Sequence, residues 1–395
     1  MSKEKILLFI LAAIQFTHIV DFMIVMPLGP QLMRLLEINP QQFALMVSSY
    51  TFSAGVVGFM FAFVADRFDR KKVLLFSYIF FTVGTFSCGF ANSYEFLLAA
   101  RILTGAFGGV MNALVYSIIA DAFPFERRAG AMGVVMASFS FASAIGVPLG
   151  LFLASIADWH LPFHALGLAG VVISAGIYYY IPALHAHIGK SDKDERIFDF
   201  LLNIGRTPNL LKALLFMFLM VMGQFVVIPF ISPYMVSNMG VSEKELTYVY
   251  LLGGTATFFT SPWIGKISDN YGKPKVFTIL ALLSIFPLFI VTNVQATPLW
   301  IVLVVSVLFF VFISGRMVPG MTMITSAVEP QHRASFMSVN SAVQQFSSAG
   351  ASMIGGMIVI TEASGKLLNY QYAGYIAIAA TLLSILVGRR LKAVE

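Results

Sequence analysis

Charged side chains are scarce in this sequence of 395 residues. Asp, Glu, Lys and Arg make up 11% of the chain, whereas soluble proteins carry about 25% charged residues. Hydrophobic residues account for 58%, including 38 Phe, which is more apolar surface than one soluble core can bury. This composition excludes an ordinary soluble protein and predicts that most of the chain lies in a lipid bilayer.

Cysteine is nearly absent as well. The single Cys88 lies in an apolar run, which excludes an intramolecular disulfide and a cysteine-based metal site. The apolar stretches contain no pair of acids, metal-ligand cluster or nucleophile–base set, and no Gly-rich phosphate loop ends in Lys-Ser or Lys-Thr. We therefore expect no enzyme activity, no cofactor, no metal and no direct use of ATP.

Twelve stretches are long and apolar enough to cross a bilayer as helices, since about 20 residues span its hydrocarbon core. The first follows only five residues and runs through Asp21 without a small-residue cleavage site, so we expect a retained span and no signal peptide. The expected spans are residues 6–30, 42–64, 73–91, 96–121, 129–156, 162–182, 209–235, 246–268, 275–292, 298–322, 334–360 and 370–388.

The basic residues predict how the chain is oriented. With both termini placed in the cytoplasm, 20 of the 25 Lys and Arg residues fall in cytoplasmic loops and three fall outside. This asymmetry follows the positive-inside rule and accounts for the net charge of +6 without a nucleic-acid partner. We expect a multi-pass protein of a cell membrane, a bacterial inner membrane, with cytoplasmic termini.

The two halves of the sequence repeat each other. The longest polar stretch, 185–208, separates an N-terminal bundle (1–184) from a C-terminal bundle (209–395). Asp66 and Asp269 occupy matching loops 203 residues apart, and Arg128 and Arg333 occupy another matching pair 205 residues apart. A nearly constant offset indicates duplicated six-helix halves, the plan of many secondary transporters.

The matching loops carry a further motif. One reads Ala62-x-x-x-Asp66-Arg67-x-Asp69-Arg70-Lys71, and the other reads Gly265-x-x-x-Asp269-x-x-Gly272-Lys273. With these loops the whole chain resembles the major facilitator superfamily, although Ala62 and Asp69 replace two glycines of the family motif. The resemblance implies an all-α membrane fold of twelve helices in two pseudo-symmetric six-helix bundles. It also implies a cytoplasmic gate motif formed by Asp66, Arg67, Arg70, Lys71, Asp269, Gly272 and Lys273.

Two other segments are similar to the twelve-helix drug:proton antiporter family. The fifth span contains Gly146-Val-Pro148-Leu-Gly150, close to the family's antiporter motif, although Ala142 stands at its first glycine and the proline comes one residue late. The first span contains Asp21-Phe-Met-Ile-Val-Met-Pro27, close to that family's first-span motif. The resemblance implies proton-coupled efflux.

Asp21 is the only acidic residue deep inside a span, which marks it as a functional candidate. Asp21 lies about 22 Å and Arg101 about 21 Å from the cytoplasmic edge, so we expect both at one depth. Burial favours a protonated Asp and a nearby Arg favours a charged one, so a change in their surroundings would bind or release a proton. His18, one turn from Asp21, is a candidate proton relay. The alternatives are a static ion pair and a hydrogen-bonded interior histidine.

Several polar or aromatic residues within spans are candidates for the substrate cavity. Arg316 either binds an anionic group or extends its charge to the membrane surface. The cavity candidates are Phe22, Asn112, Tyr116, Gln224, Tyr234, Arg316, Gln344 and Gln345.

The sequence favours a monomeric secondary transporter that exports small lipophilic or cationic compounds in exchange for protons. A carrier of a sugar, a nucleoside or another metabolite is the alternative, although such a site would favour more Asn, Gln and Trp than this chain offers, with three Trp. A non-transporting receptor or channel is the alternative of another class, and duplicated halves argue against it.

Overall fold

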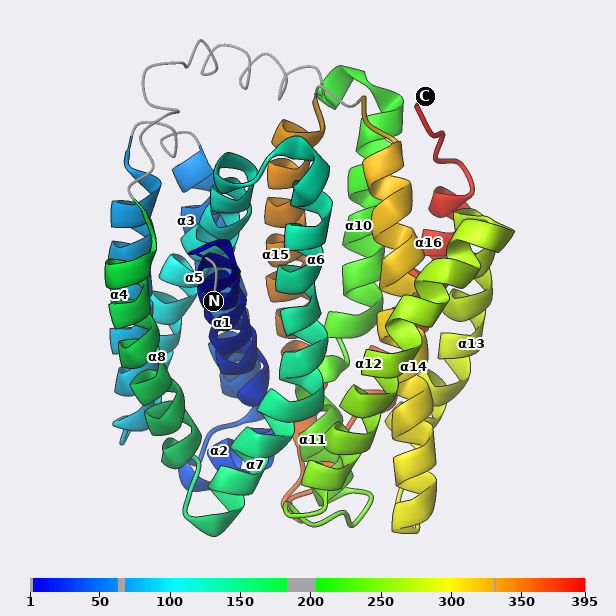
Figure 1. Cartoon of the computed structure of the whole chain (residues 1–395). Coiled ribbons are helices and arrows are strands. Elements are labelled where there is room, and N and C mark those ends of the chain that lie inside the picture. Colours follow the sequence, from blue (N-terminus) through cyan, green and yellow to red (C-terminus); the bar gives the residue numbers. More distant parts are fainter. Residues whose placement is uncertain (1–2, 63–67, 183–203, 330–331, 395) are drawn as a thin grey trace.

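Long apolar stretches of this chain form helices because a bilayer offers no water to pair with exposed backbone groups. The computed structural model describes residues 3–62, 68–182, 204–329 and 332–394, and most of these residues are helical (Figure 1).

The described residues of the first half form eight α-helices and one π-helical turn. They are α1 (Lys3–Ile24), α2 (Gly29–Leu35), α3 (Pro40–Ala62), α4 (Arg70–Gly89), α5 (Tyr94–Ala122), α6 (Phe125–Phe141), η2 (Ala142–Gly146), α7 (Val147–Ile156) and α8 (His160–Tyr180).

In the second half, the part of the chain that the structure describes forms seven further helices and a short antiparallel hairpin. They are α10 (Pro208–Phe225), α11 (Ile228–Ser237), α12 (Leu246–Tyr271), α13 (Lys273–Asn293), α14 (Leu299–Ser326), α15 (Arg333–Ile358), β1 (Ile360–Thr361), β2 (Leu367–Leu368) and α16 (Tyr370–Gly388).

Within the described residues, ten helical segments are long and apolar enough to cross a membrane. The eighth and eleventh expected spans, α12 and α15, have 26 residues each but are not among the ten. Both are helices through which the two halves contact each other. Their small and polar residues therefore suit protein neighbours better than lipid.

Two expected spans are broken. The stretch 6–30 was expected as one helix, but α1 ends at Ile24 and α2 begins at Gly29. The stretch 209–235 also divides, because α10 ends at Phe225 and α11 begins at Ile228. In each case a proline stands in the first turn of the second piece, where its missing N–H group is tolerated.

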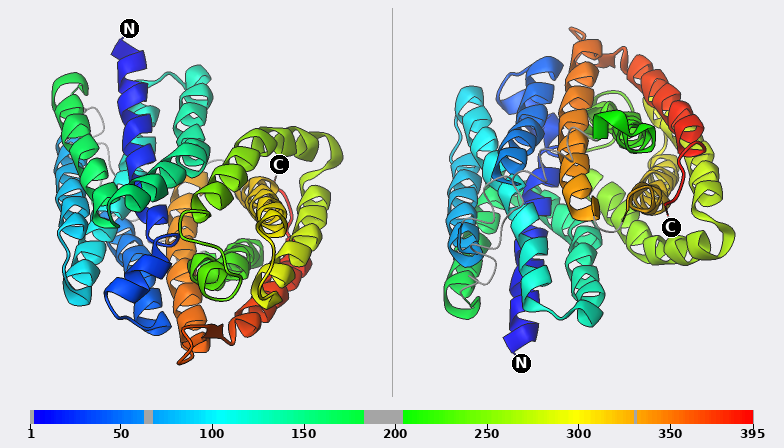
Figure 2. Two further views of the ribbon diagram at one scale, coloured as in Figure 1. Left: turned by 90° about the horizontal axis from the view of Figure 1, so that it is seen from below. Right: turned by 90° about the horizontal axis from the view of Figure 1, so that it is seen from above.

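The two halves stand side by side (Figure 1), and views along the bundle show each as a separate group of helices (Figure 2). The main contacts between them join α3 with α15, α12 with the α6–η2–α7 segment, and α2 with α11. The predicted boundary segment, 185–208, lies largely outside the described residues, so the domain division stays a prediction.

The halves are sealed at the end that carries α2 and α11, called here the closed end. One apolar cluster, called here the shared cluster, includes Val25 and Phe43 from the first half and Val226 and Phe230 from the second. Toward the opposite end, one cluster contains only first-half residues such as Leu11, and another contains only second-half residues. Apolar packing therefore joins the halves at one end and leaves them as separate cores at the other.

Polar contacts reinforce the closed end. Arg34, in α2, forms an ion pair with Glu243, which precedes α12. Asn238 exchanges two hydrogen bonds of 2.9 Å with the backbone of Leu367, which ties the hairpin to the end of α11. β1 also contacts α3, so the hairpin lies against both halves.

One glycine permits the close approach of α12 to the π-helical turn. A Cβ atom at Gly254 would lie 2.3 Å from the backbone oxygen of Ser143 and 2.8 Å from Cα of Ala144. These atoms belong to the backbone and cannot rotate away. Gly254 therefore fixes the spacing between the halves at this level.

We predict that Gly254→Ala lowers the free energy of unfolding by about 1–3 kcal/mol, because the added methyl group forces the two helices apart. Thermal unfolding of the purified protein in detergent measures the change. The matched control is Gly350→Ala in α15, where a Cβ atom meets nothing within 4 Å. Equal unfolding temperatures for the two variants would contradict this account of the contact.

Candidate functional site

The two deep charges predicted from the sequence lie in direct contact. The Arg101 Nη1 atom is 2.8 Å from Oδ2 of Asp21, and the two side chains are 1% and 0% exposed. The other carboxylate oxygen of Asp21 accepts a hydrogen bond of 3.1 Å from Thr85 Oγ1. Three helices, α1, α4 and α5, therefore contribute to one buried charged group.

An aromatic ring covers the guanidinium of this pair. Cζ of Arg101 lies 4.3 Å from the centre of the Tyr50 ring, within the range of a cation–π contact. Arg101 Nε and Tyr50 Oη have no hydrogen-bond partner among the described residues. The guanidinium of Arg101 is thus held by the Asp21 carboxylate and the Tyr50 ring, while its Nε–H group has no described acceptor.

His18 lies next to the pair without a hydrogen bond of its own. Neither ring nitrogen has a partner in the described part of the chain, although both are shielded from the surroundings. Its ring contacts those of Tyr50 and Phe81, with centres 6.3 and 5.9 Å apart. A Cβ atom at Gly108 would meet His18 Nε2 at 2.7 Å and Tyr50 Oη at 3.0 Å, so both polar atoms face the same small space beside α5.

Two of the predicted cavity residues, Asn112 and Phe22, contact residues that were not predicted as part of the site. The side-chain amide of Gln15 donates a hydrogen bond of 3.2 Å to the side-chain oxygen of Asn112. Phe22 stacks near Phe225, with ring centres 6.2 Å apart, and this contact joins the two halves. The sequence reasoning missed Gln15, although its position as a polar residue near the middle of the first span was a signal that could have found it.

Arg316 lies inside the second half and is fully buried. Its guanidinium donates hydrogen bonds to Thr381 Oγ1 at 2.8 Å, Ser284 Oγ at 3.3 Å and the backbone oxygen of Gly223 at 3.0 Å. The alternative considered from the sequence, a side chain reaching to the membrane surface, does not match this burial.

The remaining cavity candidates are dispersed. Gln224 is buried and its amide lies 3.8 Å from the sulfur of Met317. Tyr234 belongs to the shared cluster at the closed end, where its ring lies 4.7 Å from that of Tyr370. Tyr116 packs beside the first-half core.

The two glutamines of α15 are both partly buried. Gln345 lies at the contact with α3, where its Cβ atom would be 3.2 Å from a Cβ atom built at Gly55. Gln344 is its neighbour in the helix. The structure therefore does not gather all eight candidates around one point.

The gate motif is described in part, since Asp66 and Arg67 lie outside the described residues. Arg70 Nη1 contacts Asp121 Oδ2 at 2.8 Å and the backbone oxygen of Ser117 at 2.7 Å, both in α5. Lys71 donates to the backbone oxygen of Tyr178 in α8. These contacts join helices of the same half.

The second copy of the gate motif is simpler. Asp269 and Lys273 form an ion pair of 3.4 Å across the turn between α12 and α13. Gly272 lies between them with φ of +91°, a conformation that favours glycine. The glycine thus permits the sharp turn between two long helices.

The antiporter-type motif packs against the helix that carries Asp21. A Cβ atom at Gly146 would lie 2.3 Å from Val20, and one at Gly150 would lie 2.6 Å from Ile24. Pro148 stands in the first turn of α7, directly after the π-helical turn η2. The two glycines thus let α1 and α7 approach closely, and π-helical turns are often found at functional sites.

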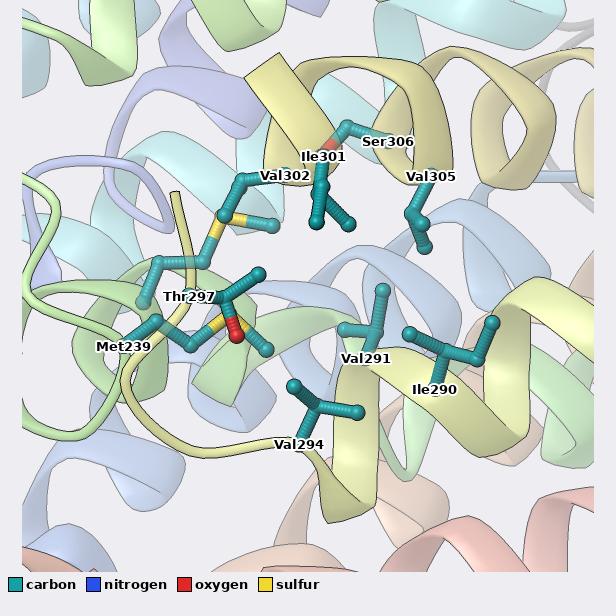
Figure 3. Close-up of a pocket in the computed structure, with 10 residues that line it drawn as sticks. Met239, Ile290, Val291, Val294, Thr297, Ile301, Val302, Val305 and Ser306 are labelled. Atoms are coloured by element: carbon teal, nitrogen blue, oxygen red, sulfur yellow. The ribbon is translucent and has the colours of Figure 1, made fainter. Parts of the chain in front are cut away.

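A separate pocket lies between α11, α13 and α14, in a part of the second half that belongs to the shared cluster (Figure 3). It encloses about 230 Å³, part of which is open to the surroundings. Its lining is mainly apolar and includes Met235, Met239, Val291 and Val302. None of the predicted site residues lines it. Its apolar lining differs from the charged pair of Asp21 and Arg101 in the first half.

A family model described as the Major Facilitator Superfamily matches residues 11–220 and 213–394. The uncharacterised MFS-type transporter YbcL of Bacillus subtilis (strain 168) is 25% identical over 316 residues, covering 80% of this chain and 79% of YbcL. The uncharacterised MFS-type transporter YwfA of the same organism is 24% identical over 365 residues, covering 91% and 86%.

Two solved structures share the fold. A bacterial homologue of the human lysosomal transporter Spinster, in an inward-facing and unoccupied conformation, has a TM-score of 0.77 and 16% identity, covering 99% of this chain and 98% of its own. A D-xylose–proton symporter has a TM-score of 0.80 and 14% identity, covering 97% of each chain. At these identities the likeness concerns the fold alone.

We predict that Arg101→Gln lowers the free energy of unfolding by about 3–5 kcal/mol, because it leaves the Asp21 carboxylate buried without its cation. Adding Asp21→Asn to that variant removes the uncompensated charge and should recover a large part of the loss. Thermal unfolding of the two single variants and the double variant measures the coupling. Additive losses would show that the two side chains do not stabilise each other.

Proposed function

Because the chain belongs to the Major Facilitator Superfamily and is therefore a membrane transporter, we propose that it is a proton-coupled antiporter that exports small lipophilic or cationic compounds. The drug:proton antiporter family supplies the nearest motif pattern, in Asp21 and in Gly146, Pro148 and Gly150.

The observation that carries this proposal is the buried pair of Asp21 and Arg101. A proton on Asp21 removes the negative charge that neutralises Arg101, so the free energy of the group changes by several kcal/mol with its protonation state. A group of this kind, linked by Thr85 to α4 and by Tyr50 to α3, can bias the packing of four helices. His18, beside it, is the proposed relay of the proton.

The proposed transport cycle begins from the packing of the two halves. The positive-inside pattern predicts that the termini lie in the cytoplasm and the closed end outside. The separate cores at the opposite end then face the cytoplasm, which corresponds to an inward-facing state. Export requires that the closed end opens while the cytoplasmic end closes, with the proton exchanged at Asp21.

An apolar or aromatic substrate suits the contact between the halves. The neighbouring rings of Phe22 and Phe225 come from opposite halves. In the second half, the sulfur of Met317, the residue after Arg316, lies against the amide of Gln224. Aromatic rings and methionine adapt to ligands of different shape. The rings of Phe22 and Tyr50, with centres 5.2 Å apart, connect this surface to the charged pair.

A second candidate function is transport of a sugar or nucleoside. The hydrogen-bonded amides of Gln15 and Asn112 favour it, because amide groups can pair with substrate hydroxyls. The coupling residue would be the same in either case, so the substrate panel described next separates the two functions.

We predict that Asp21→Asn abolishes proton-coupled transport while the protein still folds, because asparagine has the shape of aspartate but cannot bind or release a proton. Purified protein in liposomes that contain a pH-sensitive dye is exposed to lipophilic cations, sugars and nucleosides, one at a time. A rise of the internal pH triggered by one class, as the substrate enters and protons leave, identifies both antiport and the substrate class, whereas a fall of the internal pH indicates symport.

The matched control is Asp158→Asn, since Asp158 is an exposed residue in the turn before α8. It should leave proton movement unchanged. If Asp21→Asn moved substrate against a gradient as well as the unmodified protein, the proposed coupling would be lost. Substrate flux without proton movement in the unmodified protein would indicate a uniporter.

We predict that Glu243→Lys favours opening of the closed end, because it replaces an ion pair with Arg34 by a repulsion. Exposed pairs contribute about 0–1 kcal/mol, so the effect should be up to about fivefold. The readout is the rate at which an impermeant maleimide, added outside, modifies a cysteine introduced as Val47→Cys, a residue of the shared cluster that is 3% exposed.

The control for this experiment exchanges the two charges. Arg34→Glu combined with Glu243→Lys restores an ion pair of opposite polarity and should return the modification rate to its original value. Cys88 is buried and serves as the internal background. An unchanged rate in Glu243→Lys would show that the ion pair does not hold the closed end.

A further inference from the structure

Arg316 carries a positive charge that no described side chain neutralises. Arg101, the other buried arginine, has the Asp21 carboxylate at 2.8 Å. The described partners of Arg316 are instead two hydroxyl groups and one backbone oxygen, all uncharged. Arginine stays protonated in proteins, and an isolated charge at membrane depth is strongly unfavourable. A counter-charge must therefore come from outside the described residues.

No described acid of the second half lies beside Arg316. Asp21 is the only acid deep in a span, and it is paired with Arg101 in the other half. The described ion pairs that include an acid of the second half, Arg34–Glu243, Asp269–Lys273 and His332–Glu329, lie at the ends of helices. An anionic ligand would supply the charge that these residues do not.

The guanidinium still has donors to offer to such a ligand. Arginine has five N–H groups, and three are used by Thr381, Ser284 and Gly223. Nε has no partner among the described residues, and one N–H group of Nη2 also remains. Nε and Nη2 form one edge of the planar group, which matches the two oxygens of a carboxylate.

The surrounding residues hold the guanidinium in a fixed orientation. Ser284 Oγ donates to the backbone oxygen of Ala281 at 2.7 Å, and Thr381 Oγ1 donates to that of Ala377 at 2.8 Å. Each hydroxyl has thus used its proton, so it can only accept from Arg316. The two hydroxyls orient the arginine and leave the anion to the arginine itself.

The broken helix places this group next to the proposed substrate path. Gly223 lies two residues before the end of α10, and the N–H group of Val227 bonds to Gln224 in place of Gly223. The Gly223 oxygen is thereby free for Arg316. Transporters commonly place ligand sites at such interruptions, where backbone groups are released from the helix.

We propose that Arg316 binds a carboxylate, with Ser284 and Thr381 as positioning residues. The ligand class is a small apolar compound that bears a carboxylate, or a free small carboxylate at the same place. The proposal rests on the proposed function and narrows its lipophilic substrates to compounds that bear a carboxylate, in place of cationic ones, but binding to the purified protein does not require proton coupling at Asp21.

The test measures the unfolding temperature of the purified full-length protein in detergent, at constant ionic strength. Three probes are added in turn: benzoate, its uncharged analogue benzamide, and formate. We expect benzoate to raise the unfolding temperature in a saturable way and benzamide to have no effect. A response to formate as well indicates a free carboxylate site, and a response to benzoate alone indicates a carboxylate carried on the substrate.

Arg316→Gln should weaken benzoate binding by at least about tenfold, since it removes the charge-assisted hydrogen bonds. Arg390→Gln, at an exposed arginine after the end of α16, is the matched control and should bind as the unmodified protein does. If Arg316→Gln does not fold, Thr381→Val is measured instead and should weaken binding several-fold by releasing the guanidinium. Equal responses to benzoate and benzamide, no response to benzoate or formate, or undiminished binding in these variants would overturn the proposal.

These outcomes are separable from those of the transport experiment. Loss of proton movement in Asp21→Asn together with undisturbed benzoate binding would support both proposals. Benzoate binding in a protein that moves no protons would leave the carboxylate site standing and remove the antiport mechanism.

Discussion

The ion pair between Asp21 and Arg101 is the interaction on which the first half depends. Two charges without water must stay together, because separating them in a medium of low dielectric constant costs several kcal/mol. The pair therefore fixes the depth and rotation of α1 relative to α5. Thr85 and Tyr50 extend this restraint to α4 and α3. A change in protonation at one carboxyl group thereby reaches four helices.

Small residues translate that restraint into close helix packing. Gly105 and Gly109 of α5 lie against the backbone of α3, where a Cβ atom would come within 2.3 and 2.2 Å of carbonyl oxygens. Gly146 and Gly150 bring α7 against α1 in the same way, and Gly254 brings α12 against η2. Without a hydrophobic effect between helices in lipid, this contact supplies much of the packing energy. The motif glycines therefore act on the helix that holds Asp21.

The second half solves the same problem differently. Among its described residues no acid lies beside Arg316, whose guanidinium donates to hydroxyls of α13 and α16 and to a carbonyl at the end of α10. The break before α11 supplies that carbonyl and also admits Tyr234 and Phe230 to the closed end. The two halves thus both consist of long helices, while the surroundings of their buried arginines differ.

The sequence by itself determined the membrane setting, the family and most of the helices, because apolar length and loop charge act locally and leave a periodic record. It also identified Asp21 and Arg101, since charges are rare at that depth. Only the tertiary structure decided that the two touch, that Gln15 pairs with Asn112, and that Arg316 faces α13 and α16 and not a membrane surface. Helix rotation and the breaks at Gly29 and Ile228 settle these contacts. They arise from packing between segments far apart in the chain, which no local pattern records.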